Sequence, residues 1–356
     1  MAHPHEQDVI TVRDIPATRF AAIGWLVLAA VLAATGAWEW RMRTVGLVAG
    51  DLGDGQENWA VERRRVAEGD HDGVVIVGGS RILFDTNFEV WQEITGRRPV
   101  QLAIPGMSGA AVLTDIADHT DFAGLVVIDF TPEQFFLEGA ANPAFKGVLD
   151  AWDKFGPAKR ASHVIGQFVS RYLAFLDDQY TLQSLIDRVD IPNREGVTSP
   201  YLRVWKLSEI YDHRQAFLWR GIERNEYLRA HAIRVWSSRD RPVPDDARIA
   251  RVCDEMRAAV ATIRARGGDV AFIRPPSAGA YYAREQRKVP RAKSWDRLLR
   301  ETGTFGIHFE DYPAMQGLNL PELSHLARED AVRFTRAYVG LLADHFPWLR
   351  TPDVTA

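Results

Sequence analysis

Two short segments of the chain carry side chains suited to nucleophilic chemistry. Ser80 follows Gly78 and Gly79 directly after a β-branched run. Glycines allow a sharp turn there and leave N–H groups that can face a developing oxyanion. Far along the chain, Glu322 precedes His325 by three residues, a spacing at which a carboxylate can reach an imidazole and hold its tautomer. These residues are a candidate nucleophile, orienting group and base.

Other candidate site residues lie near the ends of further predicted strands. Gly106, in Ile104-Pro105-Gly106, is placed to offer another backbone N–H. Arg274 ends a strand and either clamps a sugar carboxylate or phosphate or forms a structural ion pair. Asp129 and Arg81 are further candidates for substrate binding, although Asp129 could instead orient a loop by accepting backbone hydrogen bonds.

A doubly wound parallel sheet would bring these residues together. Runs typical of buried strands occur at 73–80, 100–104, 124–130, 270–274 and 307–311. Helical patterns lie between and after them, at 87–95, 110–122, 246–266, 294–302 and 328–345, the last capped by Ser324 or a neighbour. Strands alternating with helices predict a flavodoxin-like α/β fold with five parallel strands. Ligands of such sheets bind at the carboxyl ends of the strands.

Between the third strand and the next helix, the β signal fades over residues 131–244, which we interpret as a large helical insertion. Within it, residues 203–241 carry nine Lys and Arg against five Asp and Glu, with tryptophans interleaved. This pattern fits a polysaccharide groove or a docking surface, and it also fits ordinary packing of amphipathic helices.

The N-terminal region contains a candidate membrane anchor. Residues 20–38 carry no charge, and a helix of that length spans roughly 28 Å, close to the hydrocarbon core of a bilayer. We expect a cytoplasmic tail at 1–19, an uncleaved transmembrane helix at 20–40 and a juxtamembrane spacer at 41–70. The main domain at 71–347 would be exported, followed by a tail at 348–356. A cleaved signal peptide and a buried helix of a soluble protein are the alternatives.

The charge, the cysteine count and the absence of known motifs argue against several classes of protein. The net charge of −4 argues against a nucleic-acid binder. The single cysteine excludes an intrachain disulfide and a cysteine-built zinc site. Because the chain has neither a Walker pattern nor a GxGxxG pattern, and no convincing set of metal ligands, we expect no cofactor and no metal.

Residues 73–130 and 267–342 resemble the SGNH/GDSL hydrolase superfamily. Within it they are most similar to membrane-anchored proteins of bacterial envelope acylation, such as alginate O-acetyltransferase-type proteins and the D-alanine transfer protein of teichoic acid synthesis. The resemblance implies that Ser80 is the nucleophile, that Gly106 lies in the oxyanion hole with the Ser80 N–H, and that His325 is the base.

The chain departs from the family pattern at three places. Gly79 replaces the usual aspartate before the serine, and Glu322 replaces the usual aspartate before the histidine. The Gly-x-Asn-Asp block is missing, and residues 129–132 stand in its place. Loss of the asparagine removes an oxyanion donor, which typically costs a hundredfold or more in rate. Either Thr131 or a backbone N–H substitutes, or the enzyme is slow, or the site is not catalytic.

Two functions therefore remain open at this stage. The first is a periplasm-facing serine O-acyltransferase or esterase of the inner membrane that acts on an envelope or secreted polysaccharide. The resemblance implies that a multi-pass membrane acyltransferase would deliver its acyl groups. The second is a catalytically degenerate SGNH-like domain that binds a glycan or scaffolds an assembly complex.

Overall fold

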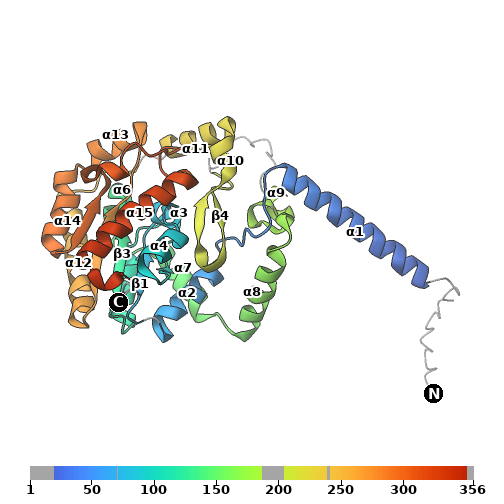
Figure 1. The fold of residues 1–356 in the computed structure, drawn as a ribbon, viewed down its shortest axis with the longest axis horizontal. Helices are drawn as coiled ribbons and strands as arrows, with labels where there is room; N and C mark the ends of the chain where they lie inside the picture. The colour runs from blue at the N-terminus through green and yellow to red at the C-terminus, as the bar shows by residue number, and fades with distance from the viewer. Residues whose placement is uncertain (1–19, 70, 187–203, 239–240, 351–356) are drawn as a thin grey trace, which may run out of the picture. The chain divides into compact units, whose positions relative to one another are not determined.

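The computed structural model describes residues 20–69, 71–186, 204–238 and 241–350 (Figure 1). The expected cytoplasmic tail lies outside the described residues, as does most of the expected C-terminal tail. The chain divides into two compact units, Met1–Leu47 and Val48–Ala356. Each is described separately below.

The described part of the Met1–Leu47 unit is dominated by one apolar helix, α1 (Phe20–Thr44). Among the described residues it is the one helix long and apolar enough to cross a membrane. Most of its large side chains are exposed, including Trp25 at 72% and Leu26 at 72%, whereas Met42 near its end is buried. Basic residues Arg41 and Arg43 occupy its last turn.

A five-stranded parallel sheet forms the centre of the Val48–Ala356 unit, as the alternating pattern predicts. The strands run in the order β2-β1-β3-β6-β7, in which every neighbouring pair is parallel. Their bounds are β1 (Val74–Val77), β2 (Val100–Gln101), β3 (Leu125–Asp129), β6 (Asp269–Arg274) and β7 (Phe305–His308). Strand β2 is shorter than expected, and β7 begins two residues earlier.

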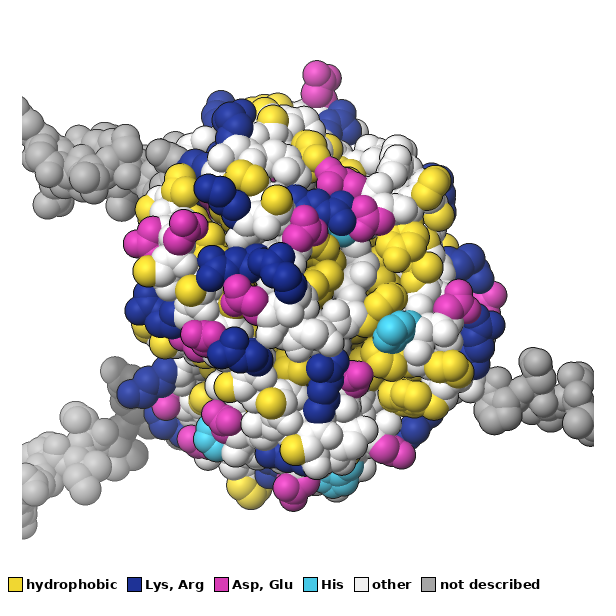
Figure 2. All heavy atoms as spheres, turned by 90° about the vertical axis from the view of Figure 1, so that its left-hand side faces the viewer, with side chains coloured by type: hydrophobic (Ala, Val, Ile, Leu, Met, Phe, Trp, Pro, Cys, Tyr) yellow, Lys and Arg dark blue, Asp and Glu magenta, His cyan; other side chains and the backbone are white. Residues whose placement is uncertain are grey.

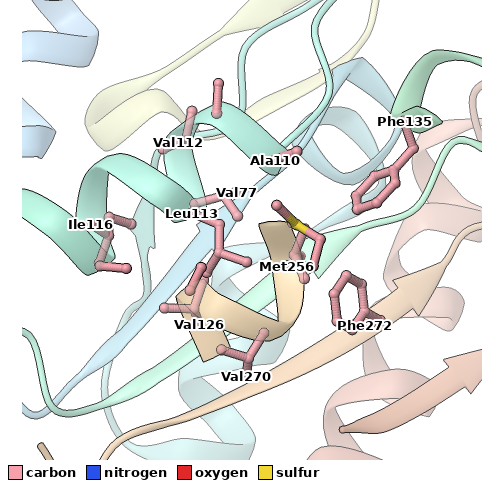
Figure 3. Packing of buried hydrophobic residues seen from close by; sticks show 14 of the residues in the cluster. Val77, Ala110, Val112, Leu113, Ile116, Val126, Phe135, Met256, Val270 and Phe272 are labelled. Atoms are coloured by element: carbon pink, nitrogen blue, oxygen red, sulfur yellow. The ribbon is translucent and has the colours of Figure 1, made fainter. Parts of the chain in front are cut away.

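Helices cover both faces of this sheet. One face packs on α2 (Gln56–Glu68), α5 (Ala110–His119), α12 (Asp246–Ala265) and α14 (Trp295–Thr302). Figure 3 shows this layer, where Val77, Val126 and Phe272 of three strands meet Leu113 of α5 and Met256 of α12. The opposite face packs on α3 (Ser80–Asp85), α4 (Phe88–Thr95) and α15 (Arg328–His345). Successive strand residues alternate between the two cores, as β geometry requires.

Several helix ends follow from local sequence signals. Asn87 accepts a hydrogen bond from the Val90 N–H and caps α4, which ends at Gly96 in the left-handed conformation. Asp245 caps α12 by accepting from the Arg248 N–H. The expectation of Ser324 as a cap was wrong: the N-cap of α15 is Ala327, whose side chain makes no capping bond.

The region expected to be a helical insertion also contains a small antiparallel sheet. Strands β4 (Ser208–Ile210) and β5 (Ala216–Leu218) pair with Glu209 opposite Phe217. The helices of the region are α6 (Pro132–Glu138), α7 (Pro143–Asp153), α8 (Pro157–Ser170), α9 (Leu182–Ile186), α10 (Arg220–Arg224) and α11 (Glu226–Ser238). Because Ile210 and Ala216 join the core under α15, this region is packed onto the sheet domain.

Residues that follow the apolar helix are held by the same region. The Leu52 N–H donates to the Ile210 carbonyl at 2.8 Å. Lys206 forms buried ion pairs with Asp51 and Asp177. The expected spacer 41–70 therefore includes residues that belong to the Val48–Ala356 unit, and α2 within it buries Trp59 against the sheet core.

Candidate active site

The candidate nucleophile lies where β1 turns into α3. Gly78 has φ +150°, and a Cβ there would lie 2.4 Å from the Asp129 Cβ. The Gly79 N–H donates to Asp129 Oδ2 at 3.0 Å. Ser80 then begins α3 and is half-buried. Only glycine fits the first position, because its conformation and its close neighbour both exclude a side chain.

Ser80, His325 and Glu322 form a continuous hydrogen-bonded relay, which we call the candidate triad. Ser80 Oγ lies 2.7 Å from His325 Nε2. His325 Nδ1 lies 2.7 Å from Glu322 Oε1. His325 and Glu322 are 2% and 0% exposed, respectively. This arrangement puts a base on the serine and an orienting carboxylate on the base, as nucleophilic acyl transfer requires.

A strained turn fixes the glutamate against the histidine. Leu323 adopts φ +73°, a conformation that residues with a side chain rarely take and that is often found at functional sites. Glu322 Oε1 also accepts the His325 backbone N–H at 2.7 Å. On either side, the Ala278 N–H donates to the Leu323 carbonyl and the Leu326 N–H donates to Asp85 Oδ1. This turn thus lets the glutamate, which is one methylene longer than the usual aspartate, contact the imidazole.

A tryptophan of the helical region contacts the candidate triad. Trp236, on α11, donates its indole N–H to Glu322 Oε2. Its ring also lies edge-on to His325 with centroids 6.2 Å apart, while Phe84 packs on the imidazole from α3 at 4.9 Å. Trp236 was noticed in the sequence only as one member of an aromatic stretch. No local spacing could indicate its partner, because 86 residues separate it from Glu322.

The expected oxyanion donors lie around the serine. The Ser80 N–H is at the first position of a helix, where it has no intrahelical acceptor. Gly106 has φ +79° and lines the same cavity as Ser80, and its carbonyl accepts from Gln134. Thr131 also lines the cavity, but its hydroxyl points to Asp129, at 3.4 Å from Oδ1. The Thr131 hydroxyl is therefore engaged, which leaves the backbone N–H groups of Ser80 and Gly106 as the candidate donors.

Asp129 and Arg274 have structural partners and are not among the residues that line the cavity. Asp129 orients the Gly79 turn, and burial raises the pKa of its carboxyl despite that hydrogen bond. Arg274 is 1% exposed and binds Glu285 Oε2 at 2.8 Å and Ser277 Oγ at 3.0 Å. Asp129 thus orients a loop, as one of the two predictions had it, and does not line the substrate cavity. Arg274 forms a structural ion pair, which was the second of its two predicted roles.

Arg81, by contrast, lines the cavity. It is 2% exposed and pairs with Glu285 Oε1 at 2.8 Å. Burial opposes the charge of Glu285, but the guanidinium groups of Arg81 and Arg274 hold its pKa below the usual value. Arg81 Nη1 is buried and has no hydrogen-bond partner among the described residues. Glu285 was not predicted from the sequence, because it lies on an amphipathic helix without a distinguishing motif.

A cavity of about 250 Å³ opens over Ser80. Its described lining includes Arg81, Arg241 and Arg284 and no acidic residue. Elsewhere the surface differs: on the face that carries α12 and α14, basic and acidic side chains are interspersed (Figure 2). No group of three or more His, Cys, Asp and Glu within the described ranges could hold a metal ion. The cavity therefore favours a negatively charged or strongly polar ligand.

Comparisons with known proteins do not place the chain in a family. No family model matches it, and no curated protein matches it.

Proposed function

We propose that the protein is a membrane-anchored, SGNH-like serine O-acyltransferase or esterase that acts on an envelope or secreted polysaccharide. The observation that carries the proposal is the 2.7 Å contact between Ser80 Oγ and His325 Nε2 beneath an open cavity. A serine of this kind is a poor nucleophile unless an adjacent base removes its proton, and His325 is positioned to do so.

In the first half-reaction Ser80 Oγ attacks the carbonyl carbon of an acyl donor, and His325 Nε2 takes the hydroxyl proton. The N–H groups of Ser80 and Gly106 face the oxyanion that forms. The bond from the carbonyl carbon to the donor oxygen or sulfur then breaks, and His325 returns the proton to that leaving atom. The product is an acyl ester on Ser80.

In the second half-reaction His325 removes the proton of an acceptor hydroxyl, which attacks the acyl ester. The ester bond to Ser80 breaks, and the serine oxygen regains its proton from His325. A sugar hydroxyl as acceptor gives transfer, and water gives hydrolysis. Trp236, Arg241 and Arg284 line the cavity in which the acceptor would bind. The arginines favour a sugar with a negatively charged substituent.

The proposed anchor is α1, with the Val48–Ala356 unit on the periplasmic side of the inner membrane. Acyl groups do not cross a bilayer unaided. In this arrangement a multi-pass membrane acyltransferase delivers them from the cytoplasmic side, and the protein passes them to the glycan.

The test is acylation of the full chain in detergent by p-nitrophenyl acetate. We expect release of nitrophenol and an intact mass increased by one acetyl group, and both signals are absent in Ser80→Ala. A persistent adduct with slow turnover indicates a transferase, whereas rapid turnover indicates an esterase. Equal nitrophenol release by wild type and Ser80→Ala, without an adduct, contradicts the proposal.

The alternative is a catalytically inactive SGNH-like protein that binds a glycan or scaffolds a polysaccharide-modifying complex. The missing asparagine of the oxyanion site and the engaged hydroxyl of Thr131 favour it. It predicts glycan binding that is unchanged in Ser80→Ala and no acyl-enzyme with any donor.

A further inference from the structure

Helix α8 has an apolar face, but this face points to the solvent and not to the protein core. Two polar residues of its middle turns face the protein: Gln167 Nε2 donates to Asn58 Oδ1 at 2.6 Å, and His163 lines a polar cavity beside the start of α2. No residue of α8 is buried. Three of its large apolar side chains and a tyrosine just beyond its end are 62–65% exposed, whereas Val169 is half-buried. The exposed residues, the α8 face, are Val164, Ile165, Phe168 and Tyr172.

The composition of the α8 face matches helices that lie in a membrane interface. Phe168 and Tyr172 form an aromatic pair with ring centroids 5.5 Å apart. Exposed basic residues lie at both ends of the patch: Lys159 in the first turn, and Arg171 after the last one, where it also pairs with the exposed Asp212. A contiguous apolar patch rimmed by cations is typical of surfaces that insert between lipid headgroups.

The chain also limits how far the α8 face can lie from α1. The Gly50 N–H donates to the Ser170 carbonyl, the last residue of α8, at 2.9 Å. Thr44, the last residue of α1, precedes Gly50 by six residues. Six residues span at most about 22 Å when fully extended. The end of α8 is thus tethered within that distance of the end of the candidate anchor.

We propose that the α8 face inserts into the headgroup–acyl boundary of the membrane that α1 spans. The inference rests on the proposed anchoring by α1 and adds a second, peripheral contact. Residues 39–44 add about 9 Å of helix beyond the apolar stretch, which brings the start of the tether to headgroup level. The α8 face lies within reach of that level, and the basic residues around it favour an anionic lipid surface.

The experiment uses the full chain in nanodiscs containing phosphatidylglycerol, with a fluorophore on an introduced cysteine. Cys253, the chain's single cysteine, is buried, and burial raises the pKa of its thiol to about 12, so it labels poorly. Three variants are compared: Phe168→Cys in the α8 face, Ala30→Cys within α1, and Tyr227→Cys on α11. Tyr227 is a matched control because it is 72% exposed. Quenching is measured with doxyl-labelled lipids.

We expect quenching of the labels at positions 168 and 30 and little quenching at position 227. Quenching at 30 without quenching at 168 overturns the proposal and assigns the α8 face to a protein partner or a second copy. Val164→Cys repeats the measurement on the same face, so that damage by one substitution is recognised. Absence of quenching at 30 instead contradicts the anchoring by α1 on which the proposal depends.

Discussion

The indole N–H of Trp236 donates a hydrogen bond to Oε2 of Glu322, the carboxylate oxygen that does not contact His325. Oε1 accepts the backbone N–H of His325 and also contacts its ring nitrogen Nδ1. Each oxygen of the carboxylate is therefore held by a different residue. Trp236 therefore links α11 to the orientation of the imidazole. It is a positioning residue of the proposed reaction, because it acts through Glu322 and not on the substrate carbonyl.

Trp236→Phe keeps an aromatic ring and removes the hydrogen bond to Glu322. A hydrogen bond to a charged group contributes about 1.5–3 kcal/mol, and we expect kcat for p-nitrophenyl acetate to fall roughly tenfold or more. The adduct on Ser80 still forms, but more slowly. Trp152→Phe on α7 is the control, because that indole lies against Arg64 and not at the candidate triad. Equal rates for wild type and Trp236→Phe would exclude the positioning role.

Glu322→Gln tests the orienting role of the carboxylate itself. An amide can hold the imidazole in the wrong tautomer, a change that lowers kcat by up to roughly 10⁴-fold in serine triads. Glu322→Asp should be less damaging if the turn at Leu323 lets the shorter side chain approach His325. Single-turnover acylation, followed by nitrophenol release, measures both. Activity of Glu322→Gln near the wild-type value would leave His325 without a required partner.

Glu285→Gln removes the charge that two buried arginines share. Breaking a buried ion pair by changing one partner costs about 3–5 kcal/mol, because the other charge is left uncompensated. We expect a loss of stability of that order in urea unfolding. Glu93→Gln is the control: Glu93 also pairs with an arginine, Arg336, but both side chains are exposed, so little change is expected. A small effect of Glu285→Gln would show that water reaches this cluster.

His308 makes stability depend on pH. Burial, followed by the nearby Arg274 and Arg291, lowers its pKa to about 3, whereas an unfolded histidine titrates near 6.5. The unfolded state therefore gains a proton as pH falls below about 6.5, and the folded state does not. Between pH 7.5 and 5 this costs the folded state up to about 2 kcal/mol. His308→Gln should lose this dependence.

The measurement for His308 is urea unfolding of both proteins at the two pH values. The quantity of interest is the difference between wild type and His308→Gln, because buried carboxyls with raised pKa, such as Asp129, act in the opposite direction in both. A difference that does not change with pH would mean that His308 is hydrated in the folded state.

Much of the sheet domain could be predicted because its signals are local. Strands β1 and β3 are runs of mostly β-branched residues in which every residue is buried, and the sharp turn after β1 needs Gly78. Ser80 and His325 could be expected to meet because the carboxyl ends of parallel strands lie at the same edge of the sheet. The short strands β4 and β5 could not be predicted, because three residues are too few to show alternation. The partners of Trp236, Arg81 and Glu285 depend on tertiary packing between distant segments.

The buried ion pairs of Lys206 affect how a force on α1 is transmitted into the Val48–Ala356 unit. Lys206 pairs in the interior with Asp51, only four residues after the first unit ends, and with Asp177, which lies between α8 and α9 in the chain. A pull applied through α1 reaches these buried ion pairs and the Leu52–Ile210 hydrogen bond before it reaches any strand of the five-stranded sheet. If α1 is anchored as proposed, lateral drag on it would load the β4–β5 region before the turn that carries Ser80.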